Sequence, residues 1–262
     1  QVNILILLLM CLALKYFIKE KYLIPGILIG FCSLIKPPVI IFLLYFLYKR
    51  KLKIVFGTIS TVIVGLILPI LRYGIKGNLV LHYDWWRFLL GSNDALFTAP
   101  DNQSYLGVFY KIKESWGAQT GFLPATIFLL LTLSVIGILF LIIYQQGLKT
   151  QLKFIRNPVL LEYSIILDLM VLFSPQAWYY GYLHLTFFFL ILFYIIAKLR
   201  QEQKNDWIIN TFLFFLIITL FGVNYEFLGR KLYYLAMNFR VIAWGGTLAI
   251  LAGLYIRCKK YG

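Results

Sequence analysis

The sequence predicts an all-α protein, a polytopic transmembrane helix bundle. Of its 262 residues, 61% are hydrophobic and 13% are charged, whereas a soluble domain carries about 25% charged residues. About nine apolar segments approach or reach the roughly 17–25 residues with which a helix crosses a bilayer. Backbone groups in hydrocarbon must be hydrogen-bonded within the chain, so each segment is expected to be a helix. The expected segments are 2–18, 22–35, 37–48, 54–70, 122–144, 159–174, 179–197, 207–224 and 239–256.

The apolar stretch 22–48 is interrupted at its centre by Lys36-Pro37-Pro38. Proline breaks a helix and keeps the residue before it out of the α conformation. We therefore expect a hairpin of two short helices that meet at Lys36. The alternative is one kinked span, which would leave the Lys15/Lys19/Lys21 group on the opposite face from the other basic clusters.

The net charge of +15 arises largely from basic residues in the connections between apolar segments. Such clusters mark the cytoplasmic ends of membrane helices. Because no basic face exists apart from these connections, nucleic acid is not expected as a partner. The clusters are Lys15/Lys19/Lys21, Lys49/Arg50/Lys51/Lys53, Lys149/Lys153/Arg156, Lys198/Arg200/Lys204 and Arg257/Lys259/Lys260. With the hairpin, all of them face the cytoplasm, and the connection 71–121 becomes a large outer loop, periplasmic or luminal.

The chain offers little material for metal, nucleotide or disulfide chemistry. Its three cysteines lie apart in or beside apolar segments, and it contains only two histidines. Neither a disulfide nor a zinc site is therefore expected. Phosphate-binding loops, hydrolase motifs and dinucleotide motifs are absent from the sequence, which excludes an ATP-driven pump within this chain. We expect no metal and no cofactor.

Lys36 is the first candidate for a functional residue. An ammonium group in a bilayer is costly unless it is paired or reaches water. Two interpretations stay open: a cation that holds a phosphate group at the outer boundary, or a turn residue that extends to the interface. The outer cations Arg230, Lys231 and Arg240, in a stretch rich in tyrosine, carry the same choice between phosphate binding and interfacial anchoring.

Other outer connections and one span hold further polar candidates. Asn102-Gln103-Ser104 precedes an amphipathic stretch and is typical of the cap of a helix on the membrane surface. The aromatic residues after Ser174-Pro175 are typical of interfacial anchors. His184 lies four residues after Tyr180 on the same helical face and is either a core histidine or part of a site. Asp168, inside a span, is expected to pair with a cation or to face water.

Five short motifs follow one another along the chain. They are Gln1-Val2-Asn3, Gly26-x-x-x-Gly30, Lys36-Pro37, Asn102-Gln103-Ser104 and Ser174-Pro175-x-x-Trp178. Their order and approximate spacing resemble those of glycosyltransferase family 87, membrane-embedded mannosyltransferase-like enzymes of the GT-C type. Each motif alone is weak, but the agreement in order extends over nearly the whole chain.

The resemblance implies a hexosyltransferase, with mannose as the expected sugar. Its donor would be a polyprenyl-phosphate-linked sugar, and its acceptor a glycan or glycolipid on the non-cytoplasmic face. A fixed cation would bind the donor phosphate and stabilise the charge that grows on it as it leaves. The phosphate-binding candidates are Lys36, Arg230 and Lys231, and the substrate-site candidates are Gln1, Asn3, Asn102, Gln103, Ser104, Trp178, Tyr180 and His184.

Two departures from the family pattern bear on activity. The carboxylate base that GT-C enzymes place in their first outer loop would precede Gln1. We therefore expect residues 1–262 to form a single transmembrane domain, the C-terminal part of a longer GT-C module that is inactive alone. The family also carries a histidine two residues after the tryptophan, where this chain has Tyr180; His184 could replace it one turn later.

The alternative function is a transporter or flippase of a lipid-linked sugar, and a non-catalytic membrane scaffold is a third. A flippase is expected to show internal repeats with broken helices in corresponding halves, and no convincing repeat is visible in the sequence. The abundance of Ile, Lys, Phe and Tyr indicates an AT-rich genome. We therefore expect an integral protein of a bacterial plasma membrane, with its active site facing outward.

Overall fold

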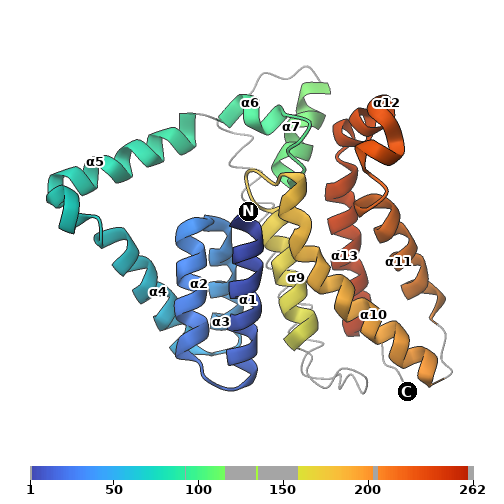
Figure 1. Ribbon diagram of the computed structural model, residues 1–262, viewed down its shortest axis with the longest axis horizontal. Coiled ribbons are helices and arrows are strands. Elements are labelled where there is room, and N and C mark those ends of the chain that lie inside the picture. The colour runs from blue at the N-terminus through green and yellow to red at the C-terminus, as the bar shows by residue number, and fades with distance from the viewer. Residues whose placement is uncertain (1, 92, 116–133, 135–158, 203–205, 259–262) are drawn as a thin grey trace. The chain divides into compact units, whose positions relative to one another are not determined.

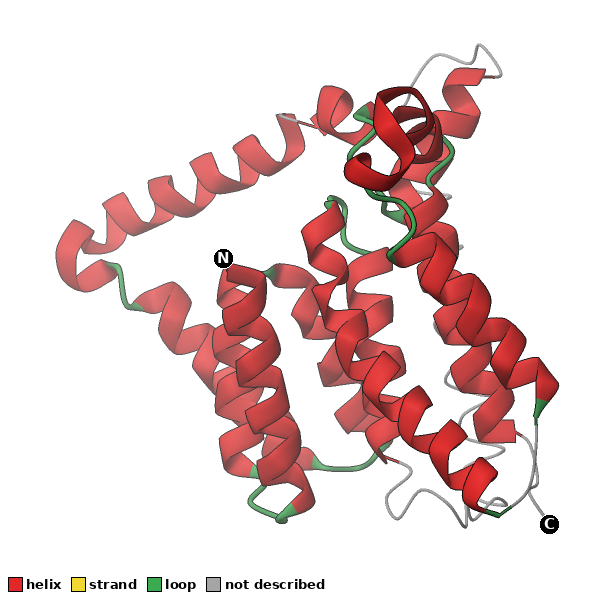
Figure 2. Ribbon diagram, turned by 45° about the vertical axis from the view of Figure 1, so that its right-hand side comes forward, coloured by secondary structure: helices red, strands yellow, loops and turns green. Residues whose placement is uncertain are grey.

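The computed structural model describes residues 2–91, 93–115, 134, 159–202 and 206–258. Helices, joined by short turns and connections, make up this part of the chain, and it contains no strand (Figure 2). The all-α prediction is therefore confirmed. The chain divides into two compact units, residues 1–96 and 97–262.

The first unit is a bundle of short helices. Its elements are α1 (Val2–Ile18), α2 (Leu23–Ile35), the 3-10 turn η1 (Pro37–Ile40), α3 (Ile41–Tyr48), α4 (Leu52–Ile67) and α5 (Ile70–Gly91). At one end Asn3 of α1 meets Lys36, which follows α2. At the other end Phe17 of α1 packs on Phe46 of α3, with ring centroids 5.1 Å apart. The chain therefore reverses at Lys36. The two short helices α2 and α3 of Figure 1 match the predicted hairpin.

Small residues allow α2 and α4 to approach closely. A Cβ atom added at Gly30 would lie 2.7 Å from the carbonyl oxygen of Thr58, and one at Gly26 would collide with the carbonyl oxygen of Ile54. The hydroxyl of Thr58 donates within its own helix, to the Ile54 carbonyl at 3.0 Å. Gly26-x-x-x-Gly30 therefore has a packing role, of the kind that small residues play between membrane helices.

Helix α5 turns away from α4 by 89°. Pro69, between the two helices, has no N–H to continue the hydrogen-bond ladder. Two α5 side chains instead bind the Leu66 carbonyl oxygen near the end of α4: Asn78 Nδ2 donates at 3.2 Å, and His82 Nε2 lies 2.9 Å away. The corner is thus fixed by polar side chains of the segment 71–121, whose described residues form α5, α6 (Asn93–Thr98) and α7 (Tyr105–Ser115), with a non-helical connection at 99–104.

The second unit contains most of the later helices. After α6 (Asn93–Thr98), which bridges the boundary between units, come α7 (Tyr105–Ser115), α9 (Val159–Leu172), the 3-10 turn η2 (Tyr179–His184), α10 (Leu185–Gln201), α11 (Trp207–Leu220), α12 (Tyr225–Asn238) and α13 (Val241–Cys258). Helix α9 is buried along almost its whole length between α10 and α13. Helix α13 also packs against α11, and α12 bends away from α11 by 85°.

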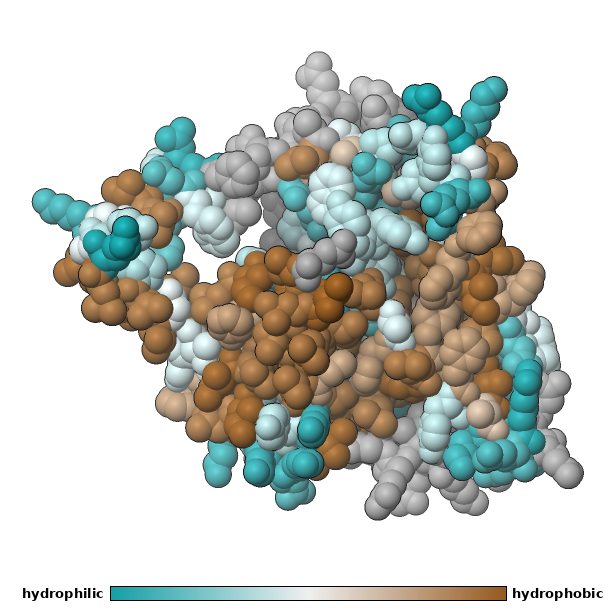
Figure 3. All heavy atoms as spheres, in the orientation of Figure 1, coloured by the Kyte–Doolittle hydropathy of each residue, from teal (hydrophilic) through white to brown (hydrophobic). Residues whose placement is uncertain are grey.

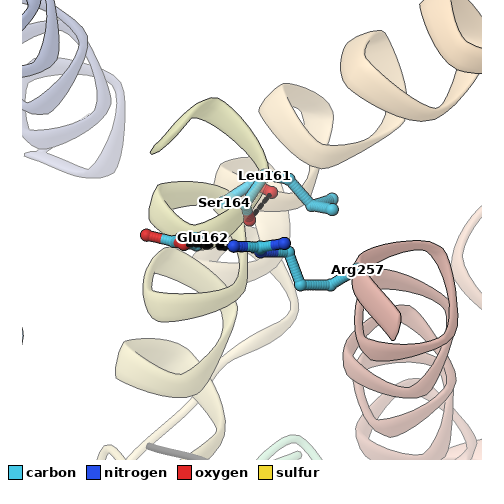
Figure 4. Close-up of polar contacts among 4 residues, drawn as sticks. All are labelled: Leu161, Glu162, Ser164 and Arg257. Carbon is cyan, nitrogen blue, oxygen red and sulfur yellow. Dashed lines mark hydrogen bonds and ion pairs between the residues drawn. The ribbon is translucent and has the colours of Figure 1, made fainter. Parts of the chain in front are cut away.

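Glu162 and Arg257 join α9 to α13 inside this unit (Figure 4). Arg257 Nε lies 3.5 Å from Glu162 Oε1, and both side chains are almost fully buried. Beside this pair, Ser164 Oγ donates to the Leu161 carbonyl at 2.7 Å. A buried carboxylate and a buried guanidinium each need such a partner, so the pair fixes α9 against α13 at the basic end of the unit.

Apolar side chains remain exposed along the helices of both units. In Figure 3 they form a broad hydrophobic surface over α1–α3, with hydrophilic side chains gathered at its lower end. Exposed examples are Val2, Leu8, Ile27, Phe31 and Leu44. A contiguous apolar surface of this kind is unfavourable in water and typical of contact with lipid.

The lengths of the apolar helices vary. Among the described helices, the stretch Tyr179–Gln201 is by itself long and apolar enough to cross a bilayer, and up to three spans result if each bent pair, α4–α5 and α11–α12, counts as one. Four shorter apolar helices accompany them. The expected segment 122–144 lies outside the described residues, and the number of about nine membrane segments stays a prediction.

Candidate functional site

Lys36 and Asn3 form the polar contact at the turn of the hairpin. The ammonium group of Lys36 donates a hydrogen bond to Asn3 Oδ1 over 3.1 Å. Lys36 adopts an extended conformation after α2, which lets Pro37 start η1. The amide of Asn3 is neutral, so it orients the ammonium without cancelling its charge. Two residues of separate motifs thus meet; Gln1, the neighbouring candidate, lies outside the described residues.

A cavity of about 610 Å³ lies between α2, α4 and α5. Its walls are mainly apolar and include Pro37, the residue after Lys36, together with Leu34 and Trp85. His82 also reaches the cavity and at the same time holds the α4–α5 corner. Apolar walls with few polar groups accommodate a hydrocarbon chain.

Asn102 and Gln103 form a buried clamp in the second unit. Both side chains are fully buried. Asn102 Nδ2 donates to the Pro175 carbonyl at 3.0 Å, and Asn102 Oδ1 accepts from the Ala177 N–H at 3.0 Å. Gln103 Nε2 donates to the Met237 carbonyl at 3.0 Å. These bonds join the connection before α7 to the one after α9 and to the end of α12, so the two amide side chains bind backbone groups of distant segments.

Ser104 begins α7, and the predicted cap is confirmed. Its hydroxyl accepts a hydrogen bond from the Gly107 N–H at 3.0 Å, which satisfies one of the free donors of the first turn. The next residue, Tyr105, shares a 2.7 Å hydrogen bond with the Thr247 hydroxyl of α13. Burial raises the pKa of Tyr105 to about 12, so this hydroxyl stays protonated, and the bond intact, at physiological pH.

Arg240 completes the clamp from the start of α13. Its guanidinium is almost fully buried and donates to the carbonyl oxygens of Thr98 at 3.0 Å and Ala99 at 2.6 Å, and also to that of Pro100. The contacts described for this cation are thus with the backbone of the connection that leads into Asn102. The other two cationic candidates of this unit, Arg230 and Lys231, are instead exposed on α12.

Aromatic rings and one carboxylate lie next to the clamp. Trp178 and Tyr180 have nearly parallel rings, 6° apart in orientation, with centroids separated by 6.5 Å. The side chain of Asp101 is exposed. Asp101, Tyr179 and Tyr180 lie within electrostatic range of the Tyr233 hydroxyl on α12. Asp101 stands out in the sequence only as a polar residue of the outer segment 71–121, directly before Asn102-Gln103-Ser104, and Tyr233 does not stand out from the neighbouring tyrosines.

Two polar candidates lie in the core of the second unit. His184 is buried at the end of η2. Asp168 is buried in α9, and neither of its carboxyl oxygens has a hydrogen-bond partner within the described part of the chain. A Cβ atom at Gly246 would lie 3.1 Å from Asp168 Oδ1 and 3.1 Å from a ring carbon of Tyr182, so the carboxyl group is tightly enclosed.

The structure thus forms two groups of candidates. Lys36 and Asn3 meet in the first unit, and the clamp, the parallel rings and the exposed cations belong to the second. Among the described residues, no three His, Cys, Asp or Glu side chains come together as metal ligands. The chemistry available is that of a fixed cation, a carboxylate and exposed aromatic rings.

The family model of glycosyltransferase family 87 matches residues 1–175, more than half of the chain. The chain belongs to glycosyltransferase family 87. It is accordingly an integral membrane glycosyltransferase, which agrees with its exposed apolar helices. The family 87 match includes Lys36 and Asn102-Gln103-Ser104, and it ends at Pro175, before Trp178 and helices α10–α13. No curated protein and no solved structure matches the chain.

Proposed function

We propose that this family 87 protein transfers a hexose, with mannose as the expected sugar, from a polyprenyl phosphate to a glycan or glycolipid acceptor. The observation that carries the proposal is the Lys36–Asn3 contact, 3.1 Å long. It fixes a positive charge at the turn of an apolar hairpin, where the phosphate of a lipid-linked sugar would arrive. The partners are then the bilayer, the lipid-linked donor and the acceptor.

The reaction needs a cation at this point. An oxygen of the acceptor hydroxyl forms a bond to the anomeric carbon while the bond from that carbon to the phosphate oxygen breaks. The bonding electrons leave with the phosphate, and a carboxylate base takes the hydroxyl proton. Because negative charge grows on the departing phosphate, an ammonium that is already in position lowers the barrier. Lys36 takes this role.

The apolar cavity supports a lipid-linked donor. Pro37 lines the cavity and directly follows Lys36, so a hydrocarbon chain in the cavity would start beside a cation. The exposed side chains of Arg230 and Lys231 on α12 are further proposed phosphate contacts. Their charge can reach a ligand without the cost of burying a cation beforehand.

The distribution of charge supports a site on the non-cytoplasmic side. In the first unit the exposed lysines Lys19 and Lys21 follow α1, at the end opposite Lys36. In the second unit Arg257 lies at the far end of α13 from Arg240 and the clamp. Basic ends of membrane helices face the cytoplasm. The candidate residues of each unit lie at the opposite ends and would therefore face outward. The membrane that we propose is a bacterial plasma membrane.

One observation keeps the flippase as a second candidate. Each unit contains a sharply bent helix pair, with angles of 89° and 85°. The helix after each bend carries a glycine with φ +67°, Gly74 in α5 and Gly229 in α12, a conformation that side chains disfavour. Broken helices in corresponding halves are typical of transporters.

A transfer assay separates the two functions. The complete protein is reconstituted in liposomes with polyprenyl-phosphate-linked radiolabelled mannose or glucose and a membrane extract as acceptor. The proposal expects labelled acceptor to accumulate. Movement of the labelled lipid across the bilayer with no labelled acceptor would reject the transferase and support the flippase.

A further inference from the structure

The outer end of the second unit carries an exposed carboxylate among exposed rings. The Asp101 side chain is exposed and lies within electrostatic range of Tyr233. The N–H of Gln103 donates to the Ala177 carbonyl at 2.7 Å, so the connection that carries Asp101 lies beside the one that carries Tyr179 and Tyr180. Both tyrosines are within electrostatic range of the Tyr233 hydroxyl as well, and 54% of Tyr180 is exposed. Gln103 also donates to the Met237 carbonyl at the end of α12, so the three segments that carry Asp101, the two tyrosines and Tyr233 are joined by direct hydrogen bonds.

The clamp holds this group rigidly. Before Asp101, Arg240 binds the carbonyl oxygens of Thr98, Ala99 and Pro100. After it, Asn102 binds the Ala177 N–H at 3.0 Å, one residue before Trp178. The backbone is thus fixed on both sides of Asp101 while its carboxylate stays accessible. A site fixed before binding loses less entropy when its ligand arrives.

The chemistry of the group fits a sugar ring. A hexopyranose presents a face of C–H groups, which packs on flat aromatic rings, and a rim of hydroxyls, which donate to a carboxylate. The parallel rings of Trp178 and Tyr180 supply the first surface, and Asp101 supplies the acceptor for the second. Hydrogen bonds to a charged acceptor are about twice as strong as neutral ones. A phosphate, in contrast, would be repelled by Asp101.

The geometry points to a binding site for the neutral hexose ring of the acceptor at Asp101, Trp178 and Tyr180, with Tyr233 at its edge. This inference deepens the proposed function and rests on it for the identity of the acceptor. It separates the two substrates by charge: the acceptor sugar binds beside a carboxylate, and the donor phosphate binds beside cations. The clamp residues Asn102, Gln103 and Arg240 act as positioning residues.

The first test measures binding without catalysis. Saturation-transfer NMR with methyl α-D-mannopyranoside and methyl β-D-glucopyranoside is recorded on the complete protein in lipid nanodiscs. Asp101→Asn and Tyr180→Ala are expected to lower the transfer signal about tenfold, as loss of a charge-assisted bond or a stacking surface predicts. Asp84→Asn and Phe227→Ala, at exposed positions outside the group, serve as controls and should keep the signal. Absence of signal from both glycosides with the unmodified protein, or equal loss in the controls, would overturn the site.

The second test assigns the ring to acceptor or donor. With a transfer assay in hand, Asp101→Asn is expected to raise the KM for the acceptor about tenfold and to leave the KM for the lipid-linked donor unchanged. A rise in the donor KM alone would overturn the assignment to the acceptor. Because Asn matches Asp in size, the variant should fold, and Trp178→Phe, which keeps a ring, should retain most of the affinity. Glycoside binding that depends on Asp101 in a protein without transfer activity would reject the proposed function and leave the sugar site standing.

Discussion

A lysine in an apolar segment loses hydrogen bonds to water, and other polar partners must replace them. Lys36 donates one hydrogen bond to a neutral amide, that of Asn3, so it is oriented by a partner that carries no opposing charge. A carboxylate in place of Asn3 would pair with the ammonium and compete with any incoming phosphate. The choice of an amide is therefore consistent with a cation that is kept available for a ligand.

The neutral amide beside Lys36 predicts a ranking of Asn3 variants. Asn3→Ala removes the orienting bond and should raise the donor KM by about tenfold or more, since a hydrogen bond to a charged group contributes about 1.5–3 kcal/mol. Asn3→Asp should raise it further, because the new carboxylate neutralises Lys36 and repels phosphate. Steady-state kinetics with varied donor concentration, on variants that melt within a few degrees of the unmodified protein, test the ranking. An Asp variant as active as the Ala variant would contradict it.

Arg240 and Asn102 show what single residues contribute away from the ligand. Both are buried and bind backbone groups distant in sequence. From the sequence, Arg240 was a candidate for phosphate binding or for anchoring at the interface. The sequence contains no information on its partners, because they are carbonyl groups about 140 residues away, which every residue possesses. Ser104 was predictable as a cap because its partner lies three residues further on.

At the scale of helices, the close contact between α2 and α4 depends on glycines, which have no side chain to hold the two backbones apart. We predict that Gly30→Leu pushes the two helices apart, because a Cβ there already lies 2.7 Å from the Thr58 carbonyl, and overpacking costs about 1–3 kcal/mol or more. The melting temperature in detergent should fall by several degrees. Phe31→Leu, at the next position and 48% exposed, should leave it nearly unchanged. Equal melting temperatures for both variants would refute the packing role.

The α9–α13 contact depends on a pair of charges. Glu162→Met leaves Arg257 buried without its partner and should cost about 3–5 kcal/mol, seen as a marked drop in thermal stability. The double variant Glu162→Met/Arg257→Met replaces both charges by apolar groups and should recover most of the loss. Arg200→Met removes an exposed cation from the last turn of α10. It serves as the control for the loss of one positive charge and should leave the stability nearly unchanged. A double variant less stable than the single one would contradict this prediction. It would show that the ion pair stabilises the protein beyond offsetting the cost of burying its two charges.

The boundaries of the apolar helices followed closely from composition. The segment 2–18 corresponds to α1, and 22–35 corresponds to α2 within one residue. Proline at 37 predicted the reversal at Lys36. The right-angle bends after α4 and α11 were not predicted, since side chains such as Asn78 and His82 fix a bend through carbonyls more than ten residues back.

For the whole molecule, the charge distribution predicts its orientation in the membrane. The three native cysteines are replaced by serine, and one new cysteine is introduced at Phe227 of α12 or at Lys19 after α1, both exposed. A membrane-impermeant maleimide added to intact cells should label Phe227→Cys. It should label Lys19→Cys only after the membrane is permeabilised. The reverse pattern would place the candidate residues on the cytoplasmic side.

The central claim is that Lys36 binds the donor phosphate of a membrane glycosyltransferase. Transfer from a polyprenyl-phosphate-linked hexose, measured with the complete protein and with Lys36→Ala, tests it most directly, with Lys15→Ala at the opposite end of α1 as the control. Our account predicts a loss of at least about a hundredfold in kcat/KM for Lys36→Ala, as loss of an electrostatic contact to the leaving group implies, and normal transfer for Lys15→Ala. A folded Lys36→Ala protein that transfers the hexose at the unmodified rate would contradict the account.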